Sequence, residues 1–299
     1  MAVVWRAKRL TIKGWSSEAE GFRQRARPRR LQRRQLSIWL GGSLLLVICL
    51  AAAASWWGLT LEPNAMNIRE RLLPPGPGHW LGTDHFGRDI FARIAYGSRI
   101  ALLVGGGSTL LAATLGASLG AWAGYKGGWW DELIMRLIDG LMAFPGILLA
   151  IMLVTVMGPG LGNTMIAIGM ANVPVFARIT RGVFLTGRNA LYVEAAHALG
   201  ARTWDIIRYH ILPNGIGPIL VQATVTFSTA ILTEASLSYL GLGIQPPDAS
   251  WGRMLKEAQP QMGRALWSVL APGAAIFIAV MALNLMGDGI RDQLDPETH

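Results

Sequence analysis

Six stretches of this chain are each long and apolar enough to cross a membrane, and this feature limits the fold more than any other. A helix that crosses the hydrocarbon core of a bilayer needs about 20 mostly apolar residues. The expected spans are residues 36–58, 100–124, 137–157, 164–185, 218–240 and 266–286. A chain of 299 residues that is 52% hydrophobic and 15% charged is too apolar for one water-soluble core. The sequence therefore predicts an all-α membrane protein with six transmembrane helices.

The basic residues are distributed unevenly among the connections, which indicates the orientation of the spans. With six spans both termini lie on one side, and 19 of the 27 Lys and Arg residues fall on that side. The other side holds 8, five of them between residues 59 and 99. Because cytoplasmic segments carry the excess of Lys and Arg, both termini are predicted to be cytoplasmic.

Residues 1–35 form a basic tail with 11 basic and two acidic side chains. A basic run can bind nucleic acid, but directly before a membrane span it favours orienting that span and contacting anionic lipid. The tail is too long for the n-region of an ordinary signal peptide, so the span 36–58 is expected to be an uncleaved anchor. Its Cys49 is the only cysteine, which excludes an intrachain disulfide and a cysteine-cluster metal site.

Residues 59–99 are predicted to form a small extracytoplasmic structure. Four prolines and several glycines between residues 63 and 87 indicate an extended, turn-rich segment. The apolar residues Ile90, Phe91 and Ile94 then suggest a short helix before the second span. The segment is a candidate lid over the membrane domain.

Ionisable groups within the spans are scarce. Glu234, in the fifth span, is the one candidate: it either contacts a transported solute or is a paired or hydrated carboxylate near the outer end. A proton-driven secondary transporter usually needs several coordinated ionisable groups and often has repeated halves, so the sequence disfavours that class. Small residues at 105–108 and 116–124 predict close packing between spans.

The connection between the fourth and fifth spans, residues 186–213, is too polar to cross a membrane. Its pattern predicts a short amphipathic helix that ends at Gly200 and a second helix that Pro213 stops before the fifth span. Glu194 in the first turn complements the positive helix end and can meet a basic partner. The apolar face of the first helix is expected to hold Tyr192, Ala195, Ala196 and Leu199.

The same connection resembles the cytoplasmic loop shared by binding-protein-dependent ABC permeases. That loop reads Glu-Ala-Ala, three residues, Gly, nine residues, Ile, any residue, Leu-Pro. The matching residues are Glu194, Ala195, Ala196, Gly200, Leu212 and Pro213. The isoleucine position is occupied by His210, with Ile211 one place later. Because this loop couples such permeases to their ATPases, the resemblance implies that the six matching residues form the ATPase-coupling site.

Other stretches are similar to the peptide, nickel and glutathione branch of that family, in particular to its second permease subunit. They are residues 81–84 and 87–89, Gly243 with residues 245–247, 251–252 and 254–255, and residues 284–289 with 291–292 and 294–296. The resemblance covers about residues 36–296 and implies the type I ABC importer permease fold. The implied organisation is a cytoplasmic tail 1–35, a first transmembrane helix 36–58, an extracytoplasmic segment 59–99, a five-helix core 100–290 that includes the coupling loop 186–213, and a cytoplasmic tail 291–299.

The resemblance implies a non-catalytic subunit of an ATP-driven importer in the bacterial inner membrane. Its expected partners are a second permease subunit, two cytoplasmic ATPases and an extracytoplasmic binding protein that delivers the solute. The chain has no Gly-rich loop ending in Gly-Lys-Ser or Gly-Lys-Thr, so a partner has to hydrolyse ATP. No cofactor is expected. The expected cargo is a di- or oligopeptide, with glutathione or a nickel chelate as alternatives, and an ion-coupled secondary transporter is the rival of a different class.

A membrane-embedded enzyme is a further alternative, and the placement of the histidines argues against it. His79 and His85 are expected outside the membrane and His197 and His210 inside. None of them pairs with another His or Glu at metal-binding helical spacing within a span. The sequence therefore indicates no catalytic and no metal site.

Overall fold

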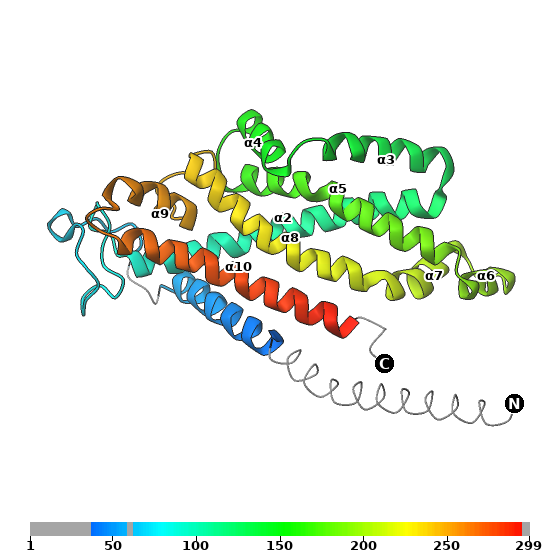
Figure 1. The fold of residues 1–299 in the computed structure, drawn as a ribbon, viewed down its shortest axis with the longest axis horizontal. Coiled ribbons are helices and arrows are strands. Elements are labelled where there is room, and N and C mark those ends of the chain that lie inside the picture. The colour runs from blue at the N-terminus through cyan, green and yellow to red at the C-terminus, as the bar shows by residue number, and fades with distance from the viewer. Residues whose placement is uncertain (1–36, 59–61, 295–299) are drawn as a thin grey trace, which may run out of the picture.

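The computed structural model describes residues 37–58 and 62–294, which fold as a bundle of long helices (Figure 1). The long helices are Ser37–Trp56, α2 (Ile90–Lys126), α5 (Leu161–Arg188), α8 (Leu212–Leu240) and α10 (Trp267–Leu294). The shorter elements are α3 (Gly128–Met142), α4 (Gly146–Met157), α6 (Leu191–Ala198), α7 (Thr203–Ile206), α9 (Trp251–Ala258), the 3-10 turns η1 (Ile68–Glu70) and η3 (Gln259–Gln261), and the π-helical turn η2 (Ile207–Ile211). The prediction of an all-α protein is confirmed for these residues. The predicted basic tail and residues 295–299 lie outside them.

The two ends of the bundle carry different elements (Figure 1). α6 and α7 project from one end, and we call residues 189–211 the elbow. α9, η3 and the irregular residues 62–89 cover the opposite end, and we call them the cap. The helix Ser37–Trp56 packs against α10, so closely that a Cβ atom on Gly41 would lie 2.8 Å from the carbonyl oxygen of Ala282.

Fewer helices are long and apolar enough to cross a membrane than the six that the sequence predicted. Four helical segments are long and apolar enough: Ser37–Trp56, Ile90–Lys126, the continuous run Thr203–Leu240 and Trp267–Leu294. Counting the pair α3 and α4 as one bent span gives five. α5 has 28 residues, but polar side chains such as Asn163, Asn172 and Arg178 make it less apolar. The described residues form a multi-span helical protein, and the count of six spans stays a prediction.

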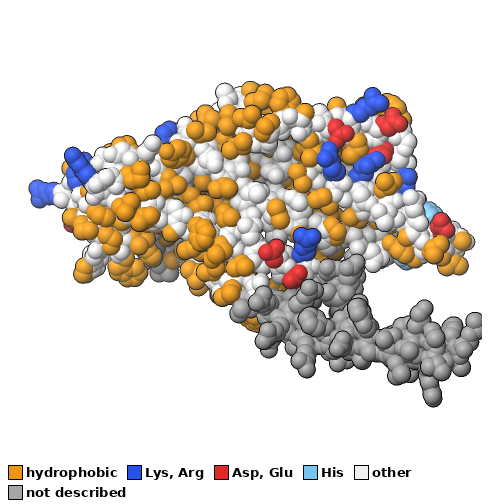
Figure 2. Space-filling model, viewed as in Figure 1, with side chains coloured by type: hydrophobic (Ala, Val, Ile, Leu, Met, Phe, Trp, Pro, Cys, Tyr) orange, Lys and Arg blue, Asp and Glu red, His pale blue; other side chains and the backbone are white. Residues whose placement is uncertain are grey.

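The distribution of apolar and charged side chains on the surface fits a protein with several membrane spans. Figure 2 shows apolar side chains over the middle of the visible face, with charged side chains gathered toward the ends and where α10 ends. A molecule whose exposed middle is apolar and whose ends are charged is suited to a bilayer, where the middle contacts acyl chains and the ends contact water.

The expected third span, residues 137–157, is not one continuous helix. α3 and α4 meet at a bend of 89°. Pro145 precedes α4 with an extended backbone. Proline lacks an N–H group and disfavours helical backbone in the residue before it, so the helix breaks at Phe144 and Pro145.

The cap and α2 join differently from the prediction. The short helix expected near Ile90 is the start of α2, which begins ten residues before the predicted span. The side chain of Asp89 caps it by accepting a hydrogen bond from the backbone N–H of Ala92 at 2.8 Å. A capped N-terminus allows α2 to start within the polar segment, because the first N–H groups have a partner there.

The predicted helix stop at Pro213 is wrong. α7, η2 and α8 form one helical run, Thr203–Leu240. Within the π-helical turn the N–H of Leu212 donates to the carbonyl oxygen of Ile207, five residues earlier. Pro213 stands in the first turn of α8 directly after this wide turn, where its missing N–H and its ring are accommodated.

The closest packing in the bundle joins α2 to α5. Gly116, Gly120 and Gly124 follow one another at intervals of four residues on the α5-facing side of α2. A Cβ atom on Gly120 would lie 2.2 Å from the carbonyl oxygen of Ala177, and one on Gly116 would lie 2.5 Å from that of Val173. The two backbones are therefore in direct contact, as small residues allow between membrane helices.

The variant Gly120→Ala tests this contact. The added methyl group meets backbone rather than a flexible side chain, so we expect the free energy of unfolding to fall by about 1–3 kcal/mol. Thermal unfolding of the detergent-purified protein measures it. The matched control is Gly140→Ala in α3, where a Cβ atom would have nothing within 4 Å. The control should be neutral or slightly stabilising, and equal stability of the two variants would contradict the packing.

Candidate functional site

The elbow is a helical corner built on the ends of α5 and α8. Two residues separate the end of α5 from the start of α6, and α7 leads through η2 into α8. Figure 1 shows α6 and α7 side by side beyond the ends of the long helices. The sequence prediction of helix, glycine, helix is therefore confirmed for residues 191–206.

Gly200 closes α6 with a pair of backbone hydrogen bonds. The N–H of Gly200 donates to the carbonyl oxygen of His197 at 3.0 Å, and that of Ala201 donates to the carbonyl oxygen of Ala196 at 3.0 Å. This is the Schellman arrangement, which requires a left-handed residue after the helix, and Gly200 has a φ of +82°. Glycine adopts this backbone without strain and most side chains do not, Asn being the usual exception. A side chain here would meet nothing within 4 Å in this chain.

A small apolar cluster fixes the elbow to the bundle. Val193 and Ala196 of α6 pack with Phe184 of α5 and with Ile206 and Ile211 of the run into α8. The apolar face predicted from the sequence is only partly correct. Ala196 is buried as expected, but Val193 is buried beside it and Tyr192 and Leu199 are exposed. α6 is two turns long, so residues three apart suffice to cover Phe184.

The outer surface of the elbow lacks cover within the described chain, and it carries large apolar side chains among charged ones such as Arg202 and Arg208. Leu191, Leu199 and Trp204 are 82%, 89% and 67% exposed, and Tyr209 is also exposed. A cluster of exposed apolar side chains on a rigid corner marks an interaction surface. Glu194 is exposed beside it.

The structure distributes the six predicted coupling residues over two places. Glu194, Ala195 and Gly200 are exposed on the elbow, and Ala196 is buried beneath it. Leu212 and Pro213 lie in the first turn of α8 and are exposed there. The two groups are joined through η2, and Ile211 of η2 packs in the elbow cluster.

Glu234 lies near the cap end of α8, far along that helix from the elbow. It is 1% exposed, and its carboxylate accepts a hydrogen bond of 2.6 Å from the Ser238 hydroxyl. Ser238 in turn accepts from the backbone N–H of Ile244 at 3.0 Å, and the Ser250 hydroxyl also bonds to Glu234. This carboxylate therefore ties both ends of the connection between α8 and α9, and it lines none of the cavities described below.

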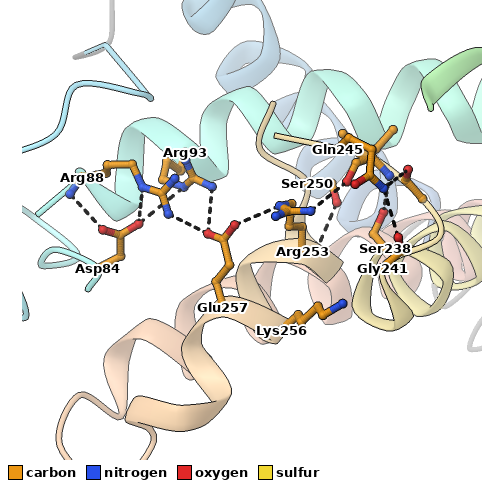
Figure 3. A network of polar contacts seen from close by, with 12 residues as sticks. Asp84, Arg88, Arg93, Ser238, Gly241, Gln245, Ser250, Arg253, Lys256 and Glu257 are labelled. Carbon is orange, nitrogen blue, oxygen red and sulfur yellow. Dashed lines mark hydrogen bonds and ion pairs between the residues drawn. The ribbon is translucent and has the colours of Figure 1, made fainter. Parts of the chain in front are cut away.

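Within the cap, a network of buried charges joins residues 84–88 to α9, and it also includes α2 (Figure 3). Arg88 contacts Asp84 and Glu257, each at 2.6 Å. Arg93, only 1% exposed, lies 3.4 Å from Glu257, and Arg253 lies 2.9 Å from it. One carboxylate thus serves three guanidinium groups, and it links segments more than 160 residues apart in sequence. Sequence reasoning missed this network; its only local signal is the spacing of four residues within two of the pairs.

The cap also contains two histidines with shifted pKa values. His79 Nδ1 lies 2.7 Å from an Asp89 carboxylate oxygen, and its Nε2 lies 3.5 Å from Glu70. The hydrogen bond with Asp89 raises the pKa of His79 above its usual 6.5, against the opposing effect of partial burial. Burial lowers the pKa of His85 below 6.5. Among the described residues, no group of three or more His, Cys, Asp or Glu side chains is placed to hold a metal ion.

The fold and the elbow together define a multi-pass helical membrane protein with an exposed interaction corner at one end. Comparison with known families identifies it further: residues 116–299 match the family described as "Binding-protein-dependent transport system inner membrane component". The chain belongs to this family and is a transport permease subunit that spans the membrane several times.

Several curated relatives share most of the chain. It is 46% identical over 271 residues to a putative peptide transport system permease protein of Brucella suis, covering 90% of both chains. It is 48% identical over 231 residues to the dipeptide transport system permease protein DppC of Alkalihalophilus pseudofirmus, covering 77% of this chain and 76% of the relative. It is 44% identical over 272 residues to the glutathione transport system permease protein GsiD of Pectobacterium atrosepticum, covering 90% and 89%.

Among solved structures, the fold resembles the MetNI methionine ABC transporter in an inward-facing conformation. The TM-score is 0.57 at 17% sequence identity, and the match covers 68% of this chain and 96% of the MetNI chain. The helical bundle is therefore an ABC importer permease fold, as the sequence predicted.

The variant Glu257→Gln tests the charge network. It leaves Arg88 and Arg93 with Asp84, and it removes the carboxylate that pairs with Arg253. Removing one partner of a buried ion pair costs about 3–5 kcal/mol. Thermal unfolding should show a clear loss of stability. The control is Asp139→Asn, because Asp139 pairs with Arg178 at 2.6 Å in an exposed site and such pairs contribute about 0–1 kcal/mol. Similar effects of the two variants would contradict the structural role of the network.

The stability of the protein should fall as the pH rises above 6.5, through the pKa of His79. A raised folded-state pKa means that protonated His79 stabilises the folded cap below 6.5 and that this contribution is lost as pH rises through the folded pKa. His85 has the opposite sign, since its lowered pKa makes stability increase with pH up to about 6.5, and above that range it is neutral in both states. Melting temperatures of wild type and His79→Gln across this range measure the difference, which should shrink with rising pH; a constant difference would exclude the effect.

Proposed function

We propose that this chain is one of two transmembrane permease subunits of an ATP-driven, binding-protein-dependent importer, with the elbow as the site where an ATPase subunit docks. The observation that carries the proposal is the exposed apolar elbow at the residues that match the family's coupling loop. An apolar corner that is 67–89% exposed at Leu191, Leu199 and Trp204 is suited to a groove on a partner protein.

The anchoring of the elbow suits it to transmit movement. Val193 and Ala196 share one cluster with Phe184 of α5 and Ile211 next to α8. A partner that displaces α6 therefore displaces the ends of two long helices together. In a packed interior such a displacement produces a rigid-body movement rather than local deformation.

The six coupling residues have distinct roles in this proposal. Glu194 and Ala195 face the partner, Ala196 anchors α6, and Gly200 provides the left-handed turn between the two elbow helices. Leu212 and Pro213 carry the movement into α8. Glu234 acts as a structural residue that holds the connection from α8 to α9.

The proposal also fixes the sides of the membrane. The elbow and both termini face the cytoplasm, and the cap faces outward, where it contacts a binding protein. The organisation expected from the sequence, with six spans and a coupling loop at residues 186–213, is retained in this form. The host membrane is the bacterial inner membrane, whose anionic lipids contact the basic tail.

The cargo proposed is a di- or oligopeptide. Named relatives carry dipeptide, peptide and glutathione transport in their descriptions, which supports a peptide-like solute and keeps glutathione as an alternative. The full importer then contains a second permease subunit, two ATPases and a solute-binding protein. ATP is hydrolysed by the ATPases, since this chain has no phosphate-binding loop.

The proposal is tested by purifying the tagged chain from native membranes in mild detergent. Mass spectrometry should find a second permease and ATPase subunits, and the complex should hydrolyse ATP in a vanadate-sensitive manner. A chain that purifies alone, in membranes whose uptake follows an ion gradient, would favour the secondary-transporter class instead.

Substitutions at Gly200 separate backbone conformation from contact with the partner. Gly200→Val should abolish ATP-dependent uptake while the protein stays in the membrane, because a β-branched residue does not adopt a φ of +82° without strain. Gly200→Asn tolerates this conformation and makes no clash within the chain. If Gly200→Asn retains uptake and Gly200→Val loses it, Gly200 is needed for the conformation of the turn. If both variants lose uptake, Gly200 is needed for close contact with the ATPase. Normal uptake with Val would contradict docking at the elbow.

A further inference from the structure

A cavity of about 830 Å³ lies at the elbow end of the bundle, between α5, α8 and α10. Its walls include Ile179 of α5, Pro218 and Gln222 of α8, and Arg291 and Leu294 of α10. Arg291 is the single charged side chain among the lining residues within 37–58 and 62–294. A second cavity of about 340 Å³ adjoins it, since Asn214 and Pro218 line both. A space of this size is large enough for a small peptide.

The polar residues of the cavity continue as a stripe along α8. Gln222, Thr229, Thr233 and Ser236 follow at intervals of seven, four and three residues, which places them on one face of the helix. All four are at least partly exposed. The adjoining side of the helix is buried and includes Thr226, Ala230, Glu234 and Leu237. The Gln222 amide N–H donates to the Thr226 hydroxyl on that side at 3.0 Å.

Water is the environment that suits this face best. The hydroxyls of Thr229, Thr233 and Ser236 donate to carbonyl oxygens of their own helix, so they tolerate lipid. The carbonyl oxygen of the Gln222 amide and the Arg291 guanidinium do not, because unpaired polar groups are costly in hydrocarbon. The cavity that holds both groups is polar and roomy enough to fill with water, and Gln222 is the stripe residue that lines it.

The exposed face of the first half of α10 has the opposite character. Leu270 and Phe277 are 59% and 65% exposed and lie seven residues apart, and Leu266, just before the helix, is 52% exposed. This face suits lipid. α8 also exposes Val225, Leu232 and Leu240 beside the stripe, so its exposed surface is mixed, whereas that of this half of α10 is apolar.

We propose that the stripe on α8 and the cavity at its elbow end form this subunit's wall of the solute path. The inference rests on the proposed function and names the residues of that path. The solute is a peptide-like molecule whose amides meet the hydroxyl and amide side chains of α8 and whose carboxylate is attracted to Arg291 at the cytoplasmic mouth. The second permease subunit covers the open side.

The path is tested by cysteine reactivity in the complete transporter, in inside-out vesicles. The background is Cys49→Ala, which removes the only native thiol of this chain, and labelling is read on this chain after the subunits are separated. Single replacements Gln222→Cys, Thr229→Cys and Ser236→Cys should react with a membrane-impermeant methanethiosulfonate reagent at least about 10-fold faster than Leu270→Cys or Phe277→Cys, because the reactive thiolate forms in water and not in lipid. Equal, slow reaction at both sets would overturn the proposal.

A matched control addresses hydroxyl exposure itself. Thr114 and Ser118 of α2 are exposed and donate to their own helix like the stripe residues, but they line neither cavity. Thr114→Cys and Ser118→Cys should react slowly. Reaction as fast as at Thr229→Cys would overturn the assignment of the path to α8.

The charge of the reagent tests the attraction at Arg291. At Gln222→Cys, an anionic methanethiosulfonate should gain several-fold over a cationic one relative to the same pair at Thr229→Cys, since Arg291 lines the cavity and a cationic lining concentrates anions, whereas its neighbours Asp288 and Asp292 are not among the described lining residues. Adding Arg291→Gln should remove this gain. An unchanged ratio would overturn the role of Arg291.

These outcomes are separate from those that test the proposed function. Thiol reactivity is read without ATP and does not require identification of the ATPase. Fast labelling of the stripe in a chain that purifies alone would keep the path and overturn the ATP-driven importer. Copurifying ATPases with an unreactive stripe would keep the importer and overturn this path.

Discussion

The contact of α2 with α5 is the constraint on which the rest of the structure depends. Gly116, Gly120 and Gly124 bring the two backbones together without intervening side chains. α5 carries the elbow at its end, whereas α2 starts in the cap and contributes Arg93 to its charge network. Because close-packed interiors transmit displacement rather than absorb it, this glycine contact connects the two ends of the molecule mechanically.

Local features were predictable where a residue has one conformational role. Gly200 ends α6 because a left-handed residue is needed there, and this rule depends on neighbours in sequence alone. Pro213 was misread because the same rules give proline two meanings, a helix stop or a residue of the first turn. Only the preceding π-helical turn decides between them, and no pattern of apolar residues announces such a turn.

Features that depend on distant segments were not predictable. Glu257 is one acidic residue on a short helix, and its three arginine partners come from α9, from α2 and from the irregular part of the cap that precedes α2. A single sequence contains no information on which charges meet across more than 160 residues. Glu234 shows the same limit. The sequence showed that ionisable groups are scarce within the spans and that Glu234 is one of them, but it did not identify Ser238 and Ser250 as the hydroxyl partners of this carboxylate.

The π-helical turn also sets the rotational phase of α8. A turn from Ile207 to Ile211 closes its hydrogen bond over five residues instead of four, so it contains one residue more than an α-helical turn. Each residue corresponds to roughly 100° of rotation at 3.6 residues per turn. A chain lacking that one residue would rotate everything beyond it by this angle relative to the elbow. The direction in which Gln222 and Thr229 face is thus determined by one inserted residue, which makes the length of this segment as constrained as its composition.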